Sequence, residues 1–233
     1  DIFIGSFFCY NGCISGEIPP EIGKLTNLVT LRLDDNELTG EIPPEIGNLI
    51  NLTYLKLDNN QLSGSIPKEI GNLENLTYLD FSQNEVSGKI PSEIESLYNL
   101  ESLILYDNEL TGMIPSEIGT LQNLQSLMLY QNQLSGSIPT EIGNLQNLQS
   151  LSLSENQLTG SIPSEVGNLV NTTYLDFRSN ELNGTIPEEI CNVGKLLDDT
   201  FIYLGLLNNK LCPPYPECIS ITNQVSQDTS ECP

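Results

Sequence analysis

Residues 28–43 read LVTLRLDDNELTGEIP, and the leucine, asparagine, glycine and proline positions of this stretch return every 24 residues. Its asparagine recurs at Asn36, Asn60, Asn84, Asn108, Asn132, Asn156 and Asn180. A fixed period of this length is typical of repeat architectures, in which each repeat is one supersecondary unit that contacts only its neighbours. The sequence therefore predicts one continuous solenoid whose length counts coils.

Each coil is predicted to contain one short strand and one short helix. Leu31 and Leu33 are separated by one residue, and this period-two spacing places both inward while Arg32 between them faces outward. The later segment GSIPTEIGN at 136–144 has a proline suited to a first helical turn and ends near a glycine, which predicts a short 3₁₀ or α segment on the convex side. The recurring asparagine is expected to bond backbone groups in the turn. The fold class expected is an α/β solenoid with a parallel sheet.

The pattern divides the chain into three parts. They are an N-terminal cap coil at 1–24, seven 24-residue repeats at 25–192, and an irregular last repeat with a C-terminal cap at 193–233. The cap coil is predicted to lie one period before the first repeat, with its inward residues matching Leu28, Leu31, Leu33 and Leu38. Those inward residues are Ile4, Phe7, Cys9 and Ile14.

Two departures from the period are expected to be visible in the structure. Asn209 follows Asn180 after 29 residues rather than 24, which predicts a five-residue insertion around 195–200 before a strand at 201–207. Thr172 stands where the pattern requires a leucine, and it is the strongest break in the inward positions.

The cysteines are predicted to staple the two caps. They are Cys9, Cys13, Cys191, Cys212, Cys218 and Cys232. Coils stacked about 5 Å apart separate the two ends by more than the roughly 7 Å that a disulfide spans, so Cys9 is expected to pair with Cys13. Three pairings remain open for the other four cysteines. We favour Cys212–Cys218 and Cys191–Cys232. A zinc site is disfavoured because the chain has no histidine and no C-x-x-C pair, and stapled caps predict an oxidising, extracellular location.

Composition excludes several classes of function. The formal charge is −23, which disfavours nucleic acid and anionic membrane surfaces, since both require a Lys/Arg footprint. No apolar run approaches the roughly 18 residues of a membrane-spanning helix, and Asp1 is expected to be a mature or trimmed end. Catalysis is not expected, because histidine and phosphate-binding loops are absent and the carboxylates recur with the repeat. We expect no cofactor.

The segment LSGSIPTEIGNLQNL at 134–148 resembles the plant-type leucine-rich repeat of receptor-kinase ectodomains, polygalacturonase inhibitors and a carrot antifreeze protein. The resemblance covers roughly residues 14–211. It implies a right-handed, twisted superhelix, an extra β-strand after the Leu-Thr-Gly step, and ligand binding on the concave face. The caps depart from the family, because the tryptophan-containing cysteine pair of the plant front cap is absent.

The outward strand positions are where a binding site is expected. Ile104, Tyr106, Met128 and Tyr130 fall on two adjacent coils and form one apolar block. Exposed apolar clusters mark contact sites, and tyrosine and methionine are enriched in interface cores. The predicted ligand-binding residues are Ile104, Tyr106, Met128, Tyr130, Tyr54, Tyr78, Asp80 and Asp107. The acidic neighbours predict a protein or peptide partner with basic groups, and carbohydrate is a close variant because tyrosines stack on sugar rings. We expect a monomer.

Other interpretations stay open. A calcium site at Asp34, Asp35 and Asp58 is conceivable, although Arg32 and Lys56 could neutralise it. Ice binding would use the column Thr39, Ser63, Ser87, Thr111, Ser135, Thr159, whose neighbouring column contains charged and bulky residues. A ligand-free scaffold is the third possibility, because the central repeats are nearly identical. Four sequons, at Asn51, Asn75, Asn171 and Asn183, could carry glycans.

Overall fold

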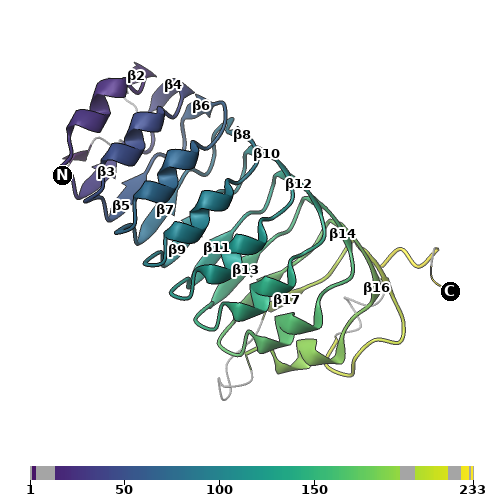
Figure 1. Ribbon diagram of the computed structural model, residues 1–233. Coiled ribbons are helices and arrows are strands. Elements are labelled where there is room, and N and C mark those ends of the chain that lie inside the picture. The colour runs from purple at the N-terminus through teal and green to yellow at the C-terminus, as the bar shows by residue number, and fades with distance from the viewer. Residues whose placement is uncertain (1, 4–13, 195–202, 220–226, 231, 233) are drawn as a thin grey trace.

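The computed structural model describes residues 2–3, 14–194, 203–219, 227–230 and 232, and it forms a curved stack of coils (Figure 1). Within these residues nine strands form one parallel sheet along the concave face, one strand per coil. In spatial order they are β1 (Ile2–Phe3), β3 (Thr30–Arg32), β5 (Tyr54–Lys56), β7 (Tyr78–Asp80), β9 (Ser102–Ile104), β11 (Ser126–Met128), β13 (Ser150–Ser152), β15 (Tyr174–Asp176) and β17 (Tyr203–Gly205). Sequence order and spatial order agree, as expected of a right-handed leucine-rich-repeat solenoid.

Short 3₁₀ helices cover the opposite, convex face (Figure 1). They are η1 (Pro20–Lys24), η2 (Pro44–Asn48), η3 (Lys68–Asn72), η4 (Ser92–Ser96), η5 (Ser116–Thr120), η6 (Thr140–Asn144), η7 (Ser164–Asn168) and η8 (Glu188–Asn192). Each follows a proline in extended conformation, such as Pro139 before η6. A Cβ on Gly71 would lie 2.5 Å from the carbonyl oxygen of Glu93 in the next coil. Glycine is therefore required there by close stacking of the helices.

Along the chain, a second short strand follows the concave strand of each coil and precedes the 3₁₀ helix in the coils that have one. These second strands form two further parallel sheets. One sheet contains β2 (Ser15–Glu17), β4 (Glu37–Glu41) and β6 (Gln61–Ser63). The other contains β8 (Ser87–Gly88), β10 (Glu109–Gly112), β12 (Gln133–Gly136), β14 (Gln157–Gly160), β16 (Glu181–Thr185) and β18 (Lys210–Cys212). The extra strand implied by the family resemblance is present, but it lies on the Leu-Thr-Gly step rather than after it.

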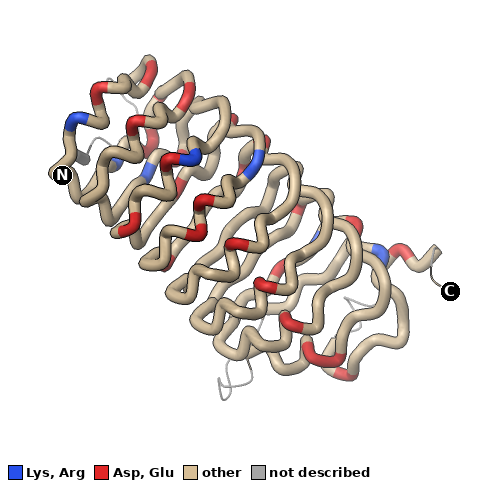
Figure 2. The backbone as a smooth tube through the Cα atoms, viewed as in Figure 1, with Lys and Arg blue, Asp and Glu red and all other residues tan. Residues whose placement is uncertain are grey.

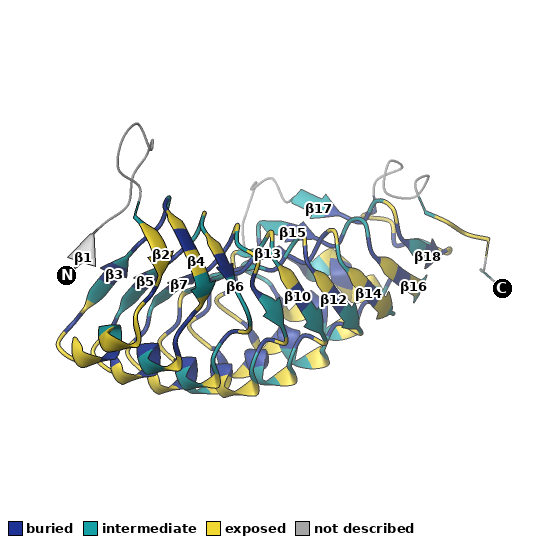
Figure 3. Ribbon diagram, turned by 90° about the horizontal axis from the view of Figure 1, so that it is seen from above, coloured by how far each residue is buried: buried dark blue, intermediate teal, exposed yellow. Residues whose placement is uncertain are grey.

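The core is a continuous column of leucine and isoleucine that runs through the stack. Figure 3 shows buried positions beside intermediate and exposed ones along the described coils. Leu103 and Leu127 are fully buried, as the period-two pattern predicts. Thr172 is also fully buried, and its Oγ1 donates a hydrogen bond of 2.7 Å to the carbonyl oxygen of Leu148. The hydroxyl is thus satisfied, so the break in the sequence pattern causes no break in the core.

The recurring asparagine forms a ladder inside the turn, as predicted. Asn132 Nδ2 donates to the carbonyl oxygens of Leu105 and Leu129 at 2.9 and 3.2 Å, while its Oδ1 accepts from Leu110 N at 3.0 Å. Gln227, from the C-terminal tail, closes the ladder on the last coil. Its Oε1 accepts from Leu211 N at 3.3 Å and its Nε2 donates to Leu206 O at 2.8 Å. The amide of a nonrepeating segment therefore replaces the asparagine of the missing next coil.

The N-terminal cap differs from the sequence prediction in its length. The first coil pairs Ile2 with Leu31, whereas we expected Phe7 at that position, so the cap is five residues longer than one period. Ile14 does match Leu38, because Ile14 N donates to Asn36 Oδ1 as Leu38 N does to Asn60 Oδ1.

The disulfides at the C-terminal end are Cys191–Cys218 and Cys212–Cys232, so the favoured pairing was wrong. Cys191 lies in η8 on the convex side and Cys212 ends β18. The chain after β18 returns to the convex side before Cys218, which lies 5.8 Å from Cys191 between Cα atoms. Cys9, Cys13 and the predicted insertion at 195–200 lie outside the described residues. The predicted strand at 201–207 corresponds to β17, which ends at Gly205, and residues 201 and 202 lie outside the described residues.

Candidate ligand-binding face

The four residues of the predicted apolar block lie together on the concave face. Ile104 on β9 is in register with Met128 on β11. The rings of Tyr106 and Tyr130, two residues further along each coil, are stacked with centroids 4.4 Å apart and planes inclined by 5°. All four side chains are half-buried. Burial raises the pKa of Tyr130 to about 12, with Tyr106 as a smaller cause, so its hydroxyl stays neutral at physiological pH.

A hollow of about 530 Å³ adjoins this block on its C-terminal side. Its lining residues are Met128, Tyr130, Ser150, Ser152, Ser154, Glu155, Tyr174 and Arg178. The coil that carries β13 has serine at all three outward strand positions, Ser150, Ser152 and Ser154. The coils on either side have larger side chains at these positions, except for Ser126 beside Ser150. The hollow is therefore the space above a coil that lacks large outward side chains.

The far wall of the hollow is a network that the sequence analysis missed. Arg178 donates to both carboxylate oxygens of Asp176 at 2.8 Å, and Asp176 is 1% exposed. Tyr174 and Tyr203 are stacked at 4.7 Å, and the guanidinium of Arg178 lies 5.6 Å from the centre of the Tyr203 ring. The sequence does contain a signal for this network, namely an acidic and a basic residue two positions apart, which lie on the same face of a strand. The same spacing occurs at Arg32 and Asp34.

The N-terminal coils carry a charged patch, which we define as Arg32, Asp34, Lys56 and Asp58. Arg32 binds Asp34 through two hydrogen bonds of 2.9 and 3.0 Å. Lys56 Nζ lies 3.2 Å from Asp34 Oδ2 and 2.9 Å from Asp58 Oδ1. Burial alone would raise the pKa of Asp34, but hydrogen bonds from Arg32 and Lys56 more than offset it and lower this pKa.

The pKa of Asp58 is shifted in the opposite direction to that of Asp34. Burial, followed by the charge of Asp80, raises the pKa of Asp58 to about 6 despite the nearby Lys56. The conceivable calcium site is weakened by these pairings, because Arg32 and Lys56 already hold the oxygens of Asp34. Among the described residues no cluster of three or more potential ligands could hold a metal ion.

Three further predicted site residues are less available than expected. Asp80 is 5% exposed and accepts hydrogen bonds from Tyr78 Oη at 3.0 Å and from Ser82 Oγ at 2.6 Å. These hydrogen bonds hold the carboxylate of Asp80 against the sheet, so little of it is accessible to a ligand. The rings of Tyr54 and Tyr78 stack on each other at 4.4 Å, so each leaves only one ring face for a sugar. Asp107, by contrast, is exposed, in a left-handed conformation with φ 55°.

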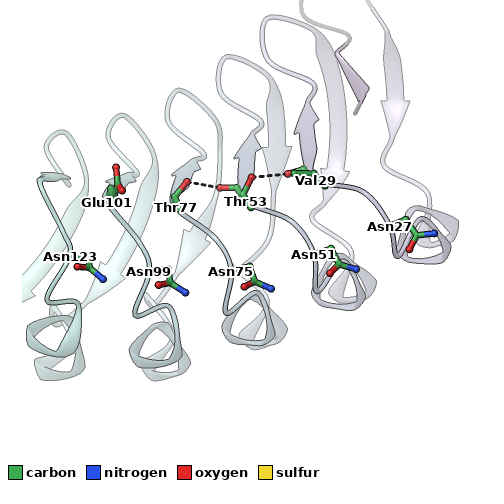
Figure 4. A pocket seen from close by; sticks show the side chains of 9 residues that line it. All are labelled: Asn27, Val29, Asn51, Thr53, Asn75, Thr77, Asn99, Glu101 and Asn123. Atoms are coloured by element: carbon green, nitrogen blue, oxygen red, sulfur yellow. Dashed lines mark hydrogen bonds between the residues drawn. The ribbon is translucent and has the colours of Figure 1, made fainter.

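A shallow groove of about 860 Å³ follows the rim where the chain enters the concave strands (Figure 4). It is lined by Asn27, Val29, Asn51, Thr53, Asn75, Thr77, Asn99, Glu101 and Asn123. The asparagines point the same way in successive coils, and each Nδ2 from Asn51 onward donates to a carbonyl oxygen of the preceding coil at 2.7–2.9 Å. Two predicted sequons, at Asn51 and Asn75, lie in this groove. The hydrogen bonds between coils therefore account for the regular spacing of these asparagines without any ligand.

Comparison with known proteins agrees with this architecture. A family model described as a leucine-rich repeat region matches residues 44–154, and single leucine-rich repeats match 27–49, 147–169 and 171–193. The chain belongs to the leucine-rich-repeat family. No curated protein sequence matches this leucine-rich-repeat chain. None of the helices in the described part of the chain has the length and apolar character needed to cross a membrane.

Among solved structures, plant leucine-rich-repeat receptors are similar to this chain. The plant peptide hormone receptor RGFR1, in complex with RGF2, is 43% identical with a TM-score of 0.80. The match covers 84% of this chain and 31% of that one. The Arabidopsis receptor kinase HAESA, in complex with the peptide hormone IDA and the co-receptor SERK1, is 37% identical with a TM-score of 0.78. That match covers 84% of this chain and 32% of that one. The chain thus spans about a third of each receptor chain.

A plant ice-binding protein is also similar, at 30% identity with a TM-score of 0.62. That match covers 87% of this chain and 71% of the ice-binding chain.

Proposed function

We propose that this leucine-rich-repeat chain is an extracellular recognition module that binds a peptide or protein on its concave face, with Ile104, Tyr106, Met128 and Tyr130 as anchors. The observation that carries the proposal is the stacked pair Tyr106–Tyr130 beside an open hollow. Rigid tyrosines supply large contact area and lose little conformational entropy on binding. A pre-formed hollow beside them is the usual form of a side-chain pocket.

Three observations support the kind of partner. The similar receptor structures contain peptide hormones, as their descriptions state. The net charge of −23 favours partners with basic groups. The disulfides Cys191–Cys218 and Cys212–Cys232 favour an oxidising, extracellular location. The proposal assigns the chain recognition and no catalytic step.

The test compares two methionines, the only two in the chain. Peptides are selected on the parent chain from a library of random linear peptides, and their affinity is measured by calorimetry for the parent, for Met128→Glu and for Met113→Glu. Met113 is 67% exposed and lies outside the concave sheet, so Met113→Glu is a matched control for the change in charge. We expect Met128→Glu to weaken binding by about tenfold or more, as at an interface hot spot, and Met113→Glu to leave it unchanged.

Two results would contradict the proposal. Equal affinities of the two variants for the selected peptides would place the site away from the apolar block. A selection that recovers no peptide above background from a library covering basic and apolar sequences would remove peptide recognition as the function. Circular dichroism of both variants checks that the solenoid is intact.

A second candidate is ice binding, supported by the similar plant ice-binding protein and by the rim row of asparagines. The column first considered for ice is less suitable, because the neighbouring column contains charged and bulky residues such as Glu41, Lys89 and Met113. The rim row is more regular, and hydrogen bonds to the preceding coil fix its amides. Thermal hysteresis of the parent chain tests this candidate. Activity that is lost in Asn75→Asp and kept in Met128→Glu would support it, and absence of hysteresis in the parent would exclude it.

A further inference from the structure

We propose that the serine-floored hollow, defined by Ser150, Ser152 and Ser154 below and by Tyr130 and Tyr174 at its sides, receives an arginine side chain of the ligand. This inference rests on the proposed peptide recognition and names the residue type that the face selects. It follows from three properties of the hollow, namely its walls, its floor and its charge.

The walls suit a flat group. Tyr106 covers one face of the Tyr130 ring, with planes inclined by 5°, and Tyr130 lines the hollow on the side of the next coil. Met128 adds an apolar surface beside it. A guanidinium is planar and stacks on aromatic faces, while its aliphatic stem packs against apolar side chains. The Tyr130 wall therefore matches both parts of an arginine side chain.

The floor supplies hydrogen-bond acceptors. Ser152 Oγ and Ser154 Oγ lie 3.3 Å apart, and both residues are at least 96% buried. Each hydroxyl oxygen has two lone pairs, so this pair retains acceptor capacity after its mutual hydrogen bond. A guanidinium has five N–H donors and no acceptor. An aromatic or aliphatic side chain in the same place would cover the hydroxyls without bonding them, which costs free energy.

The charge around the hollow favours a cation. Both carboxylate oxygens of Asp176 are bonded to Arg178, whose guanidinium lies near Tyr203 in the following coil. This pair is neutral as a unit. Glu155 is exposed at the edge of the hollow, and none of the described Lys or Arg side chains forms an ion pair with it. One uncompensated carboxylate beside two tyrosines is suited to a planar cation.

The experiment uses the two methionine methyl groups as reporters. The full chain is labelled with ¹³C at the methionine methyls, which gives one signal at Met128 in the hollow and one at Met113 outside it. It is titrated with N-acetyl-arginine amide and, separately, with N-acetyl-citrulline amide, which has nearly the same shape without the charge. N-acetyl-tryptophan amide is the third probe. No peptide ligand is needed, so the result is independent of the peptide selection.

We expect the arginine probe to shift the Met128 signal in a saturable manner, with affinity several-fold above that of citrulline, and to leave Met113 unmoved. Ser152→Leu, which fills the hollow, should abolish the shift. Glu155→Gln should weaken binding by about two- to fivefold, as an exposed ion pair predicts, whereas Glu109→Gln on β10 should not change it.

Several outcomes would overturn the inference. Equal binding of arginine and citrulline would show that charge is not recognised. Stronger binding of the tryptophan probe would make the hollow an aromatic subsite. No saturable shift at Met128 with any probe, or equal shifts of both methionines, would show that the hollow holds no such side chain. The proposed function would survive these outcomes if selected peptides still distinguished Met128→Glu from Met113→Glu.

Discussion

The two halves of the concave face use the same backbone positions in different ways. In the charged patch, Arg32 and Lys56 are bound to Asp34, so the polar groups satisfy one another. Around the apolar block, Tyr130 and Met128 border a hollow that no side chain of the described chain fills. In the first half the outward side chains therefore stabilise the solenoid, whereas in the second half they leave contact area for a partner. Outward position alone does not make a residue a ligand contact.

The largest expected difference between the halves appears when one carboxylate is neutralised in each of them. Asp34→Asn should destabilise the chain by about 2 kcal/mol, less than the roughly 3–5 kcal/mol of a fully buried pair because Arg32 and Lys56 keep some contact with water. Asp107→Asn is the matched control, since asparagine tolerates its positive φ, and it should change stability by less than about 0.5 kcal/mol. Denaturant unfolding measures both. Similar losses in the two variants would remove the distinction between the halves.

The second effect is the pH dependence that Asp58 confers on the charged patch. Its folded-state pKa of about 6 lies above the ordinary aspartate value of about 3.9. Between these values the folded state binds more protons than the unfolded state, so the contribution of Asp58 to stability falls as pH rises from about 4 to about 6.

The variant Asp58→Asn lacks this titration. Its stability relative to the parent should therefore increase from pH 4 to pH 7, by on the order of 1 kcal/mol after allowance for solvent screening. Unfolding curves of both proteins at a series of pH values measure the difference. A difference that is constant with pH would show that Asp58 has an ordinary pKa and that Lys56 stabilises its charge.

Two tyrosine hydroxyls give a smaller contrast. Tyr78→Phe removes a hydrogen bond of 3.0 Å to the buried Asp80 and should cost about 0.5–1 kcal/mol. Tyr106→Phe removes a 3.5 Å contact to Gln83, which is at the limit of a hydrogen bond, and a minor hydroxyl interaction with Tyr130. Neither involves a buried charge, so this variant should be neutral within about 0.3 kcal/mol. Midpoints of chemical unfolding distinguish the two. A larger loss in Tyr106→Phe would assign a structural role to the apolar block.

The scaffold could be predicted from sequence because its causes repeat. The coils present mostly leucine at the same inward positions and the same asparagine in the turn, so one correct assignment, such as Leu103 or Asn132, fixes the corresponding positions of the others. The C-terminal disulfides could not be predicted in this way. Their pairing depends on the path of the nonrepeating tail after Cys212, for which the period contains no information.

The candidate site was predicted only in part, for a physical reason. The apolar block is a property of single positions, and its four residues lie where the columns placed them. Whether a polar side chain is free depends on its neighbours across the sheet, and Asp80 is bound to Tyr78 and Ser82. The hollow depends on the absence of large side chains above Ser152, which becomes visible only when the adjacent coils are in place.

The smallest effect tests whether attraction in the charged patch or repulsion on the convex face dominates the response to salt. One glutamate recurs in the first turn of every 3₁₀ helix, and Figure 2 shows acidic positions on successive helices with few basic ones between them. Like charges on neighbouring coils repel by somewhat under 1 kcal/mol per pair before screening. The ion pairs of Lys56 are few and partly buried, so salt screens them less.

We therefore expect the melting temperature to rise by a few degrees between low and high concentrations of sodium chloride, as measured by circular dichroism. Asp34→Asn, which lacks part of the charged patch, should show at least as large a rise. A fall in the parent that becomes a rise in Asp34→Asn would mean that the ion pairs of the N-terminal half outweigh the convex repulsion. In that case the charged patch, rather than the repeated glutamates, would determine how the solenoid responds to ionic strength.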